Sequence, residues 1–310
     1  MGLFILCFLT TGGALDYLYF DAFTPSGPTL PAATLFSLGA ASMITLAAYH
    51  GGGSLILGSL GAERPDTQIP EHRELRNIVT EMALASGAAM PQVYVIYDPA
   101  PNALATGTND KNSAICVTTG LLALLDREET QGVVAHEMSH IRNEDILLMT
   151  MVSILLGGIA ILADLGRRGF YSPRAGQRLG RKTPLLLLPL SLLIGLAPLI
   201  GRILSMAVSR QREYLADATA AQYTRNPVGL ARALEKIRDA AIPFRGATRG
   251  TAHLFFTSPL RRRLENSDSR LAHLLTTHPP INRRIELLYR MAGIMRPPVQ
   301  NTRNASTRSA

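Results

Sequence analysis

Two histidines and a glutamate in the segment AHEMSH have the types and spacing that hydrolytic metal chemistry requires. His136 and His140 are four residues apart, so on a helix their rings project from one face and can bind one Zn²⁺ at about 2.0–2.1 Å. Glu137 lies beside His136, where it can take a proton from a metal-bound water whose pKa the metal has lowered. A water activated in this way attacks a peptide carbonyl. The segment therefore predicts a zinc-dependent peptide hydrolase with Glu137 as its general base, and a chance match on an amphipathic helix is the weaker alternative.

A catalytic zinc ion needs a third protein ligand and one open coordination position. The sequence favours Glu213, in the segment SRQREYLADATAAQY, because this segment follows a long apolar block and returns to the polar region. An ion-paired glutamate on a helix face is the alternative reading of Glu213. Asp217 lies one helical turn further on, where it can accept the second ring N–H of a ligand histidine and fix its tautomer. Glu144 is expected on the same helix as His140, from where it cannot turn back to the same ion. The remaining glutamate candidates after His140 are Glu235, Glu265 and Glu286.

A helix is expected to carry the histidine motif. Asp126 and Glu129 have the spacing of a capping box, which predicts a helix that begins at Arg127. We expect this helix to run through the motif and to continue from Ile146 into a long apolar stretch. Its first half would then bind metal and its second half would lie in lipid.

The rest of the polar region is expected to form helices around a small sheet. The segment PEHRELRNIVTEMALASG has apolar residues at helix spacing and ends in glycine. Residues 90–98 and 113–120 are rich in apolar and β-branched side chains and read as strands, with a short extended piece between them. Helical patterns return in NPVGLARALEKIRDAA and HPPINRRIELLYRMAG. The predicted fold is therefore mainly α with a sheet of two or three strands.

Four apolar blocks interrupt the polar sequence, at residues 3–20, 31–57, 146–165 and 184–208. Each block has the ~20 residues that a helix needs to cross a bilayer. A soluble domain can bury one such helix, but four predict a multi-pass membrane protein. No basic residue precedes the first block, which favours an uncleaved anchor over a signal peptide. Cys7 and Cys116 have no metal-ligand spacing and read as buried apolar residues.

The predicted organisation alternates membrane and polar parts. Lys and Arg are absent between the first two blocks and frequent in the polar regions, which places both polar regions in the cytoplasm. The basic loop at 166–183 would lie outside against this bias, so the depth of the third and fourth blocks stays open. The net charge of +8 is scattered without aromatic platforms, which argues against nucleic-acid binding. The predicted parts are two transmembrane helices (1–60), a first catalytic part (61–145), a hydrophobic helical hairpin (146–208), a second catalytic part with the third ligand (209–295) and a disordered tail (296–310).

Four segments occur together in this chain: AHEMSH, SRQREYLADATA, PNALATGTND and THPPINRRIELL. Together they resemble the HtpX-type membrane zinc metalloproteases, which are relatives of the CAAX-prenyl endoproteases. The likeness extends from the two amino-terminal spans to about Met291. It implies a thermolysin-like (zincin) catalytic core that binds Zn²⁺ through two histidines and one glutamate and faces the cytoplasm.

The resemblance also implies roles for three further residues. Asn102 would lie beside the cleft, and the extended piece after it would pair with the backbone of a substrate. His278 and Arg284, one or both, would stabilise the oxyanion of the tetrahedral intermediate. Three alternatives stay open: a turn asparagine bonded to its own backbone, a histidine at a helix start and a surface arginine. Arg283 is the weaker candidate of the paired arginines.

These features predict an integral membrane zinc endopeptidase with one Zn²⁺ per chain. Its expected partners are the lipid bilayer and misfolded or membrane-associated polypeptides, which it would cut at the cytoplasmic face of the inner or plasma membrane as part of stress-linked quality control. A prenyl-protein endoprotease is one alternative, disfavoured because such enzymes carry more spans. A non-catalytic zinc-binding membrane scaffold or sensor is the other, and the presence of Glu137 argues against it because a structural site does not need this residue.

Overall fold

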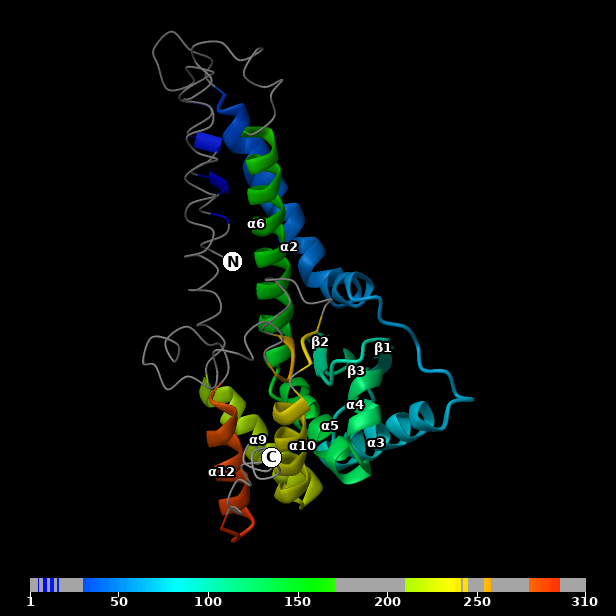
Figure 1. Ribbon diagram of the computed structural model, residues 1–310. Helices are drawn as coiled ribbons and strands as arrows, with labels where there is room; N and C mark the ends of the chain where they lie inside the picture. Colours follow the sequence, from blue (N-terminus) through cyan, green and yellow to red (C-terminus); the bar gives the residue numbers. More distant parts are fainter. Residues whose placement is uncertain are drawn as a thin grey trace, which may run out of the picture.

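The computed structural model describes residues 30–170, 210–240, 242–244, 254–257 and 279–295, together with positions 5, 8, 9, 12, 13 and 16, and describes the side chains of α6 as far as Gly157. The described chain is mostly helical with one small sheet, as predicted (Figure 1). Its elements are α2 (Ala32–Ser59), α3 (Pro70–Ser86), β1 (Gln92–Ile96), β2 (Ala103–Asn109), β3 (Asn112–Thr118), α4 (Thr119–Leu124), α5 (Arg127–Arg142), α6 (Asp145–Phe170), α9 (Arg210–Thr224), α10 (Pro227–Ala240) and α12 (Ile281–Met291).

Two long helices, α2 and α6, lie side by side and extend away from the part that contains the sheet (Figure 1). Within the described residues, α2 is the one helix long and apolar enough to cross a membrane. Its outer positions are apolar and exposed, with Phe36 at 80% and Met43 at 73%, which suits contact with lipid better than contact with water. The helices approach closely at Gly52, where an added Cβ would lie 2.5 Å from Ile154. The predicted spans at 184–208 and, apart from six isolated positions, at 3–20 lie outside the described residues.

The sheet has three strands in the order β1-β3-β2. β1 runs parallel to β3, and β2 runs antiparallel to it. β3 is the central strand and is buried along almost its whole length, with Cys116 fully buried and unbonded as a free thiol. β2 is consequently at the edge of the sheet, where Leu104 forms an isolated antiparallel bridge with Phe255.

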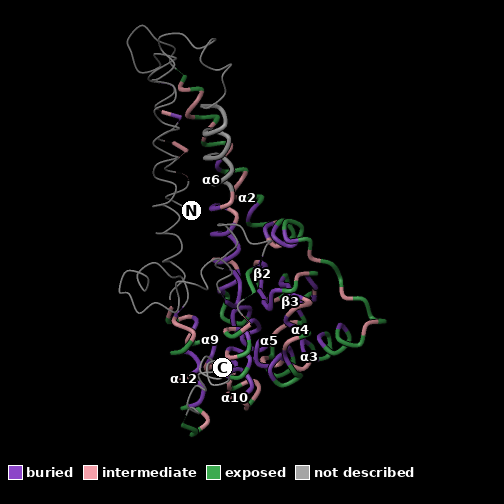
Figure 2. Tube along the Cα trace, in the orientation of Figure 1, coloured by how far each residue is buried: buried purple, intermediate pink, exposed green. Residues whose placement is uncertain are grey.

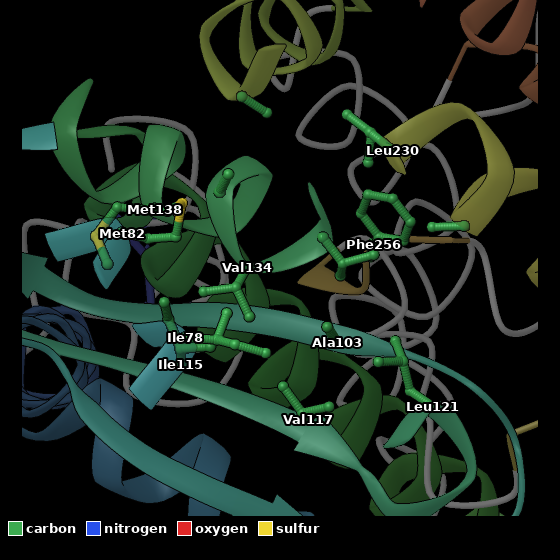
Figure 3. Close-up of a cluster of buried hydrophobic side chains, with 14 of the residues drawn as sticks. Ile78, Met82, Ala103, Ile115, Val117, Leu121, Val134, Met138, Leu230 and Phe256 are labelled. Carbon is green, nitrogen blue, oxygen red and sulfur yellow. The ribbon is translucent and has the colours of Figure 1, made fainter. Parts of the chain in front are cut away.

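α5 is the central helix of the part that contains the sheet, and it packs against α3, α9 and α10. Figure 2 shows it as a largely buried segment, and Figure 3 shows Val134 and Met138 of α5 among the side chains of the main apolar cluster. Gly132 lets α10 approach closely, because an added Cβ would lie 2.8 Å from the backbone nitrogen of Leu230. The predicted capping box is present: Asp126 Oδ1 accepts from the Glu129 N–H at 3.0 Å. The histidine motif is therefore carried by a capped and largely buried helix.

The helix with the histidine motif does not continue into the apolar stretch, so that prediction was wrong. α5 ends at Arg142, Glu144 adopts a left-handed conformation with φ +59, and α6 begins at Asp145. The expectation that Glu144 extends the motif helix fails for the same reason. The break is not evident from the sequence because the apolar periodicity continues on both sides of it. The signal for the break is the polar run Asn-Glu-Asp at residues 143–145, since asparagine and aspartate favour turns and helix ends.

Candidate active site

His136 and His140 on α5 and Glu213 on α9 meet in the interior, each no more than 3% exposed. The Nε2 atoms of the two histidines are 3.2 Å apart, and each lies 3.7 Å from a different carboxylate oxygen of Glu213. The donors of a tetrahedral ion with bonds of about 2.0–2.1 Å are about 3.3 Å apart. Two imidazole nitrogens and a carboxylate at these separations therefore fit one tetrahedral metal ion. Glu213 is thus buried against both histidines and does not lie on an exposed helix face.

A carboxylate lies against the other ring nitrogen of each histidine. His136 Nδ1 is 3.0 Å from Asp217 Oδ1, and His140 Nδ1 is 3.3 Å from Asp145 Oδ2. With Nδ1–H bonded to a carboxylate, each ring keeps Nε2 as the acceptor that a metal requires. Asp217 was expected in this position and Asp145 was not. On a continuous helix Asp145 would face away from His140, and the break at Glu144 brings it back.

Arg284 of α12 is a buried residue, only 2% exposed, so the surface-arginine alternative is wrong. Its guanidinium donates to both oxygens of Asp217, from Nε at 2.8 Å and from Nη2 at 2.7 Å. Its Nη1 donates to the backbone carbonyl of Phe256 at 3.3 Å and lies 3.7 Å from Glu213 Oε2. Arg283, the weaker candidate, bonds instead to Glu286 at an exposed position. Arg284 therefore fixes Asp217 and offers a donor to a peptide carbonyl.

Burial changes the protonation behaviour of the central groups. It raises the pKa of Glu137 to about 7, and it lowers the pKa of His136 to about 4. Burial also disfavours the charged form of His140, but the bond to Asp145 and the charge of Glu213 outweigh it and raise the pKa of His140. For Asp217 burial is outweighed by the charge and bonds of Arg284, so its pKa is lowered. A neutral His136 suits a metal ligand, and a Glu137 that titrates near neutrality suits a group that takes and gives a proton.

Asn102 stands at the start of β2 and is 2% exposed. Its Nδ2 donates to the carbonyl of Thr257 at 2.9 Å, and its Oδ1 accepts from the backbone nitrogens of Thr257 at 3.2 Å and Ala103 at 3.0 Å. The side chain of Asn102 thus bonds to the backbone of Ala103, its neighbour in the chain, and to the backbone of the distant Thr257. His278 lies outside the described residues.

Asp145 and its partner Arg212 are the functional candidates that sequence reasoning missed. Arg212 of α9 bonds to Asp145 Oδ1, while Asp145 Oδ2 faces His140. This pair joins the start of α6 to the helix that carries Glu213. The sequence signal that could have identified Asp145 is its position as an acidic residue between the histidine motif and the apolar block that begins at Ile146.

A mostly helical fold in which a His-Glu-x-x-His helix and a glutamate from a second helix converge defines a metallopeptidase. The chain belongs to peptidase family M48, whose sequence pattern matches residues 70–292. This assignment confirms the resemblance found in the sequence, and it makes the chain an enzyme rather than a non-catalytic scaffold.

Two relatives and one solved structure illustrate the likeness. The chain is 46% identical over 245 residues to a protease HtpX homolog of Caldanaerobacter subterraneus subsp. tengcongensis, covering 78% of this chain and 79% of that one. It is 36% identical over 294 residues to a protease HtpX homolog of Levilactobacillus brevis, covering 91% and 92%. The crystal structure of Ste24p from S. mikatae has a TM-score of 0.50 at 18% identity, covering 93% of this chain and 62% of that one. The likeness to Ste24p shows a shared fold, over about three fifths of that longer chain.

Proposed function

We propose that this M48 metallopeptidase is a multi-pass membrane zinc endopeptidase in which His136, His140 and Glu213 bind one Zn²⁺ and Glu137 is the general base. The observation that carries the proposal is the convergence of three buried donor atoms, all within 4.8 Å of one another, beside a buried glutamate. When bound, a zinc ion supplies a Lewis acid that polarises a peptide carbonyl and lowers the pKa of a water molecule.

The chain's own residues divide the remaining work. Glu137, with a pKa of about 7, accepts the proton of the attacking water and returns it to the leaving amine. Asp217 and Asp145 hold the rings of His136 and His140 in the tautomer that binds metal. Arg284 offers Nη1 to a carbonyl oxygen, and it already makes this contact with a backbone carbonyl. His278 is proposed, on the family resemblance, to share this stabilisation of the oxyanion.

The substrates are proposed to be misfolded or membrane-associated polypeptides cut at the cytoplasmic face of the inner or plasma membrane. Asp145 is the first residue of α6 and contacts His140, so the site lies at the base of the two long apolar helices. This placement supports a site close to the membrane surface. The frequent Lys and Arg of both polar regions support the cytoplasmic orientation.

The function is tested with the full chain purified in detergent and loaded with zinc. Wild type is expected to cleave casein, and Glu137→Gln is expected to lose this cleavage because the amide cannot accept the proton. Equal cleavage by both proteins would refute the proposed base.

The ligand set is tested by the zinc content per chain. Glu213→Ala is expected to lower it well below one, whereas the matched change Glu144→Ala, at the helix break, is expected to leave it at one. Unchanged zinc content in Glu213→Ala would refute the third ligand.

The topology is tested with Arg174→Cys in a chain that lacks the two native cysteines. A hairpin that does not cross is expected to be labelled by an impermeant thiol reagent only after the inner face has been opened. Labelling in intact cells would show that the hairpin crosses the membrane.

A further inference from the structure

The segment Leu254–Thr257 lies along the outer edge of β2. Phe255 pairs with Leu104 in an antiparallel bridge, and the Phe256 N–H donates to the carbonyl of Ala103 at 2.8 Å. This is the strand next to the proposed base, because the backbone of Ala105 on β2 lies near the carboxylate of Glu137. A piece of the chain itself thus fills the place beside β2 in which an extended substrate is expected.

The backbone of Phe256 and Thr257 is bonded to β2, to Asn102 beside it and to Arg284. Ala103 accepts from Phe256 N–H, and Arg284 Nη1 donates to Phe256 C=O. Asn102 Oδ1 accepts a hydrogen bond from the backbone N–H of Thr257, and Asn102 Nδ2 donates one to the backbone carbonyl of Thr257. These four contacts involve no side chain of the segment, so an extended peptide of another sequence can make all of them.

The side chain of Phe256 reaches into the centre of the site. Its ring lies 4.9 Å from the ring of His136, edge to face at 82°, and the guanidinium of Arg284 lies 4.9 Å from its centroid. An aromatic ring gains from both contacts, because a cation over a ring face is attracted by it and an aliphatic side chain offers no such face. Figure 3 shows Phe256 among the side chains of the main apolar cluster, near Leu230.

Leu254 and Phe255 anchor the segment on the other side. Both are 1% exposed and belong to a second apolar cluster, which also contains Phe244. The ring of Phe255 lies 4.8 Å from that of Phe244. This anchor is separate from the residues that bind metal or accept protons. It therefore sets how tightly the segment is held without taking part in the chemistry.

We propose that Leu254–Thr257 is an internal pseudosubstrate segment, which a polypeptide substrate must displace from β2, and that the position of Phe256 marks a subsite for an aromatic residue next to the cut bond. The proposal rests on the proposed peptidase function and adds to it a self-occupied peptide site. The opposing explanation is a permanent fourth strand that substrate never replaces.

A reversible disulfide tests the displacement. Leu104 and Phe255 are a non-hydrogen-bonded antiparallel pair, because the hydrogen bond beside them joins Ala103 and Phe256. The Cα atoms of Leu104 and Phe255 are therefore expected to be about 4.5 Å apart, which is within disulfide range. Leu104→Cys with Phe255→Cys is made in a chain lacking Cys7 and Cys116, because Cys116 is the sheet partner of Leu104. The oxidised enzyme should cleave casein at least tenfold more slowly than the same enzyme after reduction, and the two single-cysteine chains should not respond to the oxidant. Equal rates in the oxidised and reduced states would overturn the proposal, whereas an inactive wild type would instead overturn the peptidase function.

A second variant decides the question should the double cysteine chain be inactive even when reduced. Phe255→Ala weakens the anchor and leaves every contact of the site in place, so the KM for casein should fall at least threefold while kcat stays within twofold. A KM that is unchanged or raised, in a variant that still binds zinc, would favour the permanent strand and overturn the proposal.

The aromatic subsite is tested by mapping the cuts that the wild-type enzyme makes in casein by mass spectrometry. Phe and Tyr are expected next to the cut bond at least three times as often as their abundance in casein predicts. A distribution that follows abundance would overturn the assignment of this subsite.

Discussion

Replacing Asp217 by asparagine, and Asp145 by asparagine in parallel, should separate metal affinity from stability. Each aspartate bonds to the Nδ1 of one histidine and to one arginine. The arginines differ: the side chain of Arg284 is 2% exposed, whereas that of Arg212 is 41% exposed. The two substitutions therefore have the same effect on a histidine but leave behind arginines in very different surroundings.

The magnitudes follow from these contacts. An asparagine keeps the volume of Asp217 but places an NH₂ group against a donor of Arg284 or His136, and it leaves a buried guanidinium without its charge partner. Breaking a buried pair costs about 3–5 kcal/mol, and the lower end applies because Glu213 Oε2 remains 3.7 Å from Arg284 Nη1. In Asp145→Asn the partly exposed Arg212 can be solvated, so about 1 kcal/mol is expected. Both variants should lose about 10–100-fold in metal affinity because each releases one histidine ring.

Thermal unfolding of the metal-free full chain in detergent measures the change in stability. Zinc titration against a competing chelator measures the change in metal affinity. The loss of about 3 kcal/mol corresponds to a midpoint lower by about 6–12 °C. Asp239→Asn is the matched control, since its side chain is 66% exposed and pairs with Arg238 away from the site; it should change neither quantity. The reasoning is refuted if Asp217→Asn is no less stable than Asp145→Asn, or if it binds zinc as tightly as wild type.

Three further predictions concern the backbone that supports the site and the metal that it is proposed to bind. Gly107 has φ +140, and a Cβ there would overlap the carbonyl of Asn112, so Gly107→Ala should lower the free energy of unfolding by about 1–3 kcal/mol in thermal unfolding. Asp126→Ala removes the cap of the motif helix, because Asp126 Oδ1 accepts from Glu129 N–H, and should cost about 1 kcal/mol in the same assay. Removal of metal by a chelator should lower the thermal midpoint, because a ligand at 1,000 times its Kd stabilises the folded state by about 4 kcal/mol.

Each of these predictions has its own control. Gly58→Ala should not destabilise the chain, because nothing lies within 4 Å of a Cβ at that helical position. The exposed Glu74 provides the comparison for the cap, and equal losses in Glu74→Ala and Asp126→Ala would contradict the role of the capping box. For chelation, Glu137→Gln should keep the response and His140→Ala should lose it. A wild-type midpoint that does not move with the chelator would contradict a bound metal in the purified protein.

Local spacing was enough to predict from the sequence which three residues converge as a possible metal site. His136 and His140 share a face because they are one turn apart on one helix, and Glu213 and Asp217 share a face of α9 for the same reason. The small sheet and the start of α5 also followed from local signals, namely β-branched runs and the capping box. Periodicity describes one element at a time, and these features belong to one element each.

The tertiary structure alone decided which distant residues complete the site. Asp145 reaches His140 because the chain turns at Glu144, an interruption that the apolar periodicity of α6 does not reveal. Arg284 is buried because α12 places it against Asp217, 67 residues away in the sequence. Asn102 binds Thr257 across 155 residues, in a contact that no local pattern encodes. The sequence by itself therefore determined which side chains can form a metal site, because they share helix faces, and the packing of separate elements determined what holds those side chains and which segment lies against them.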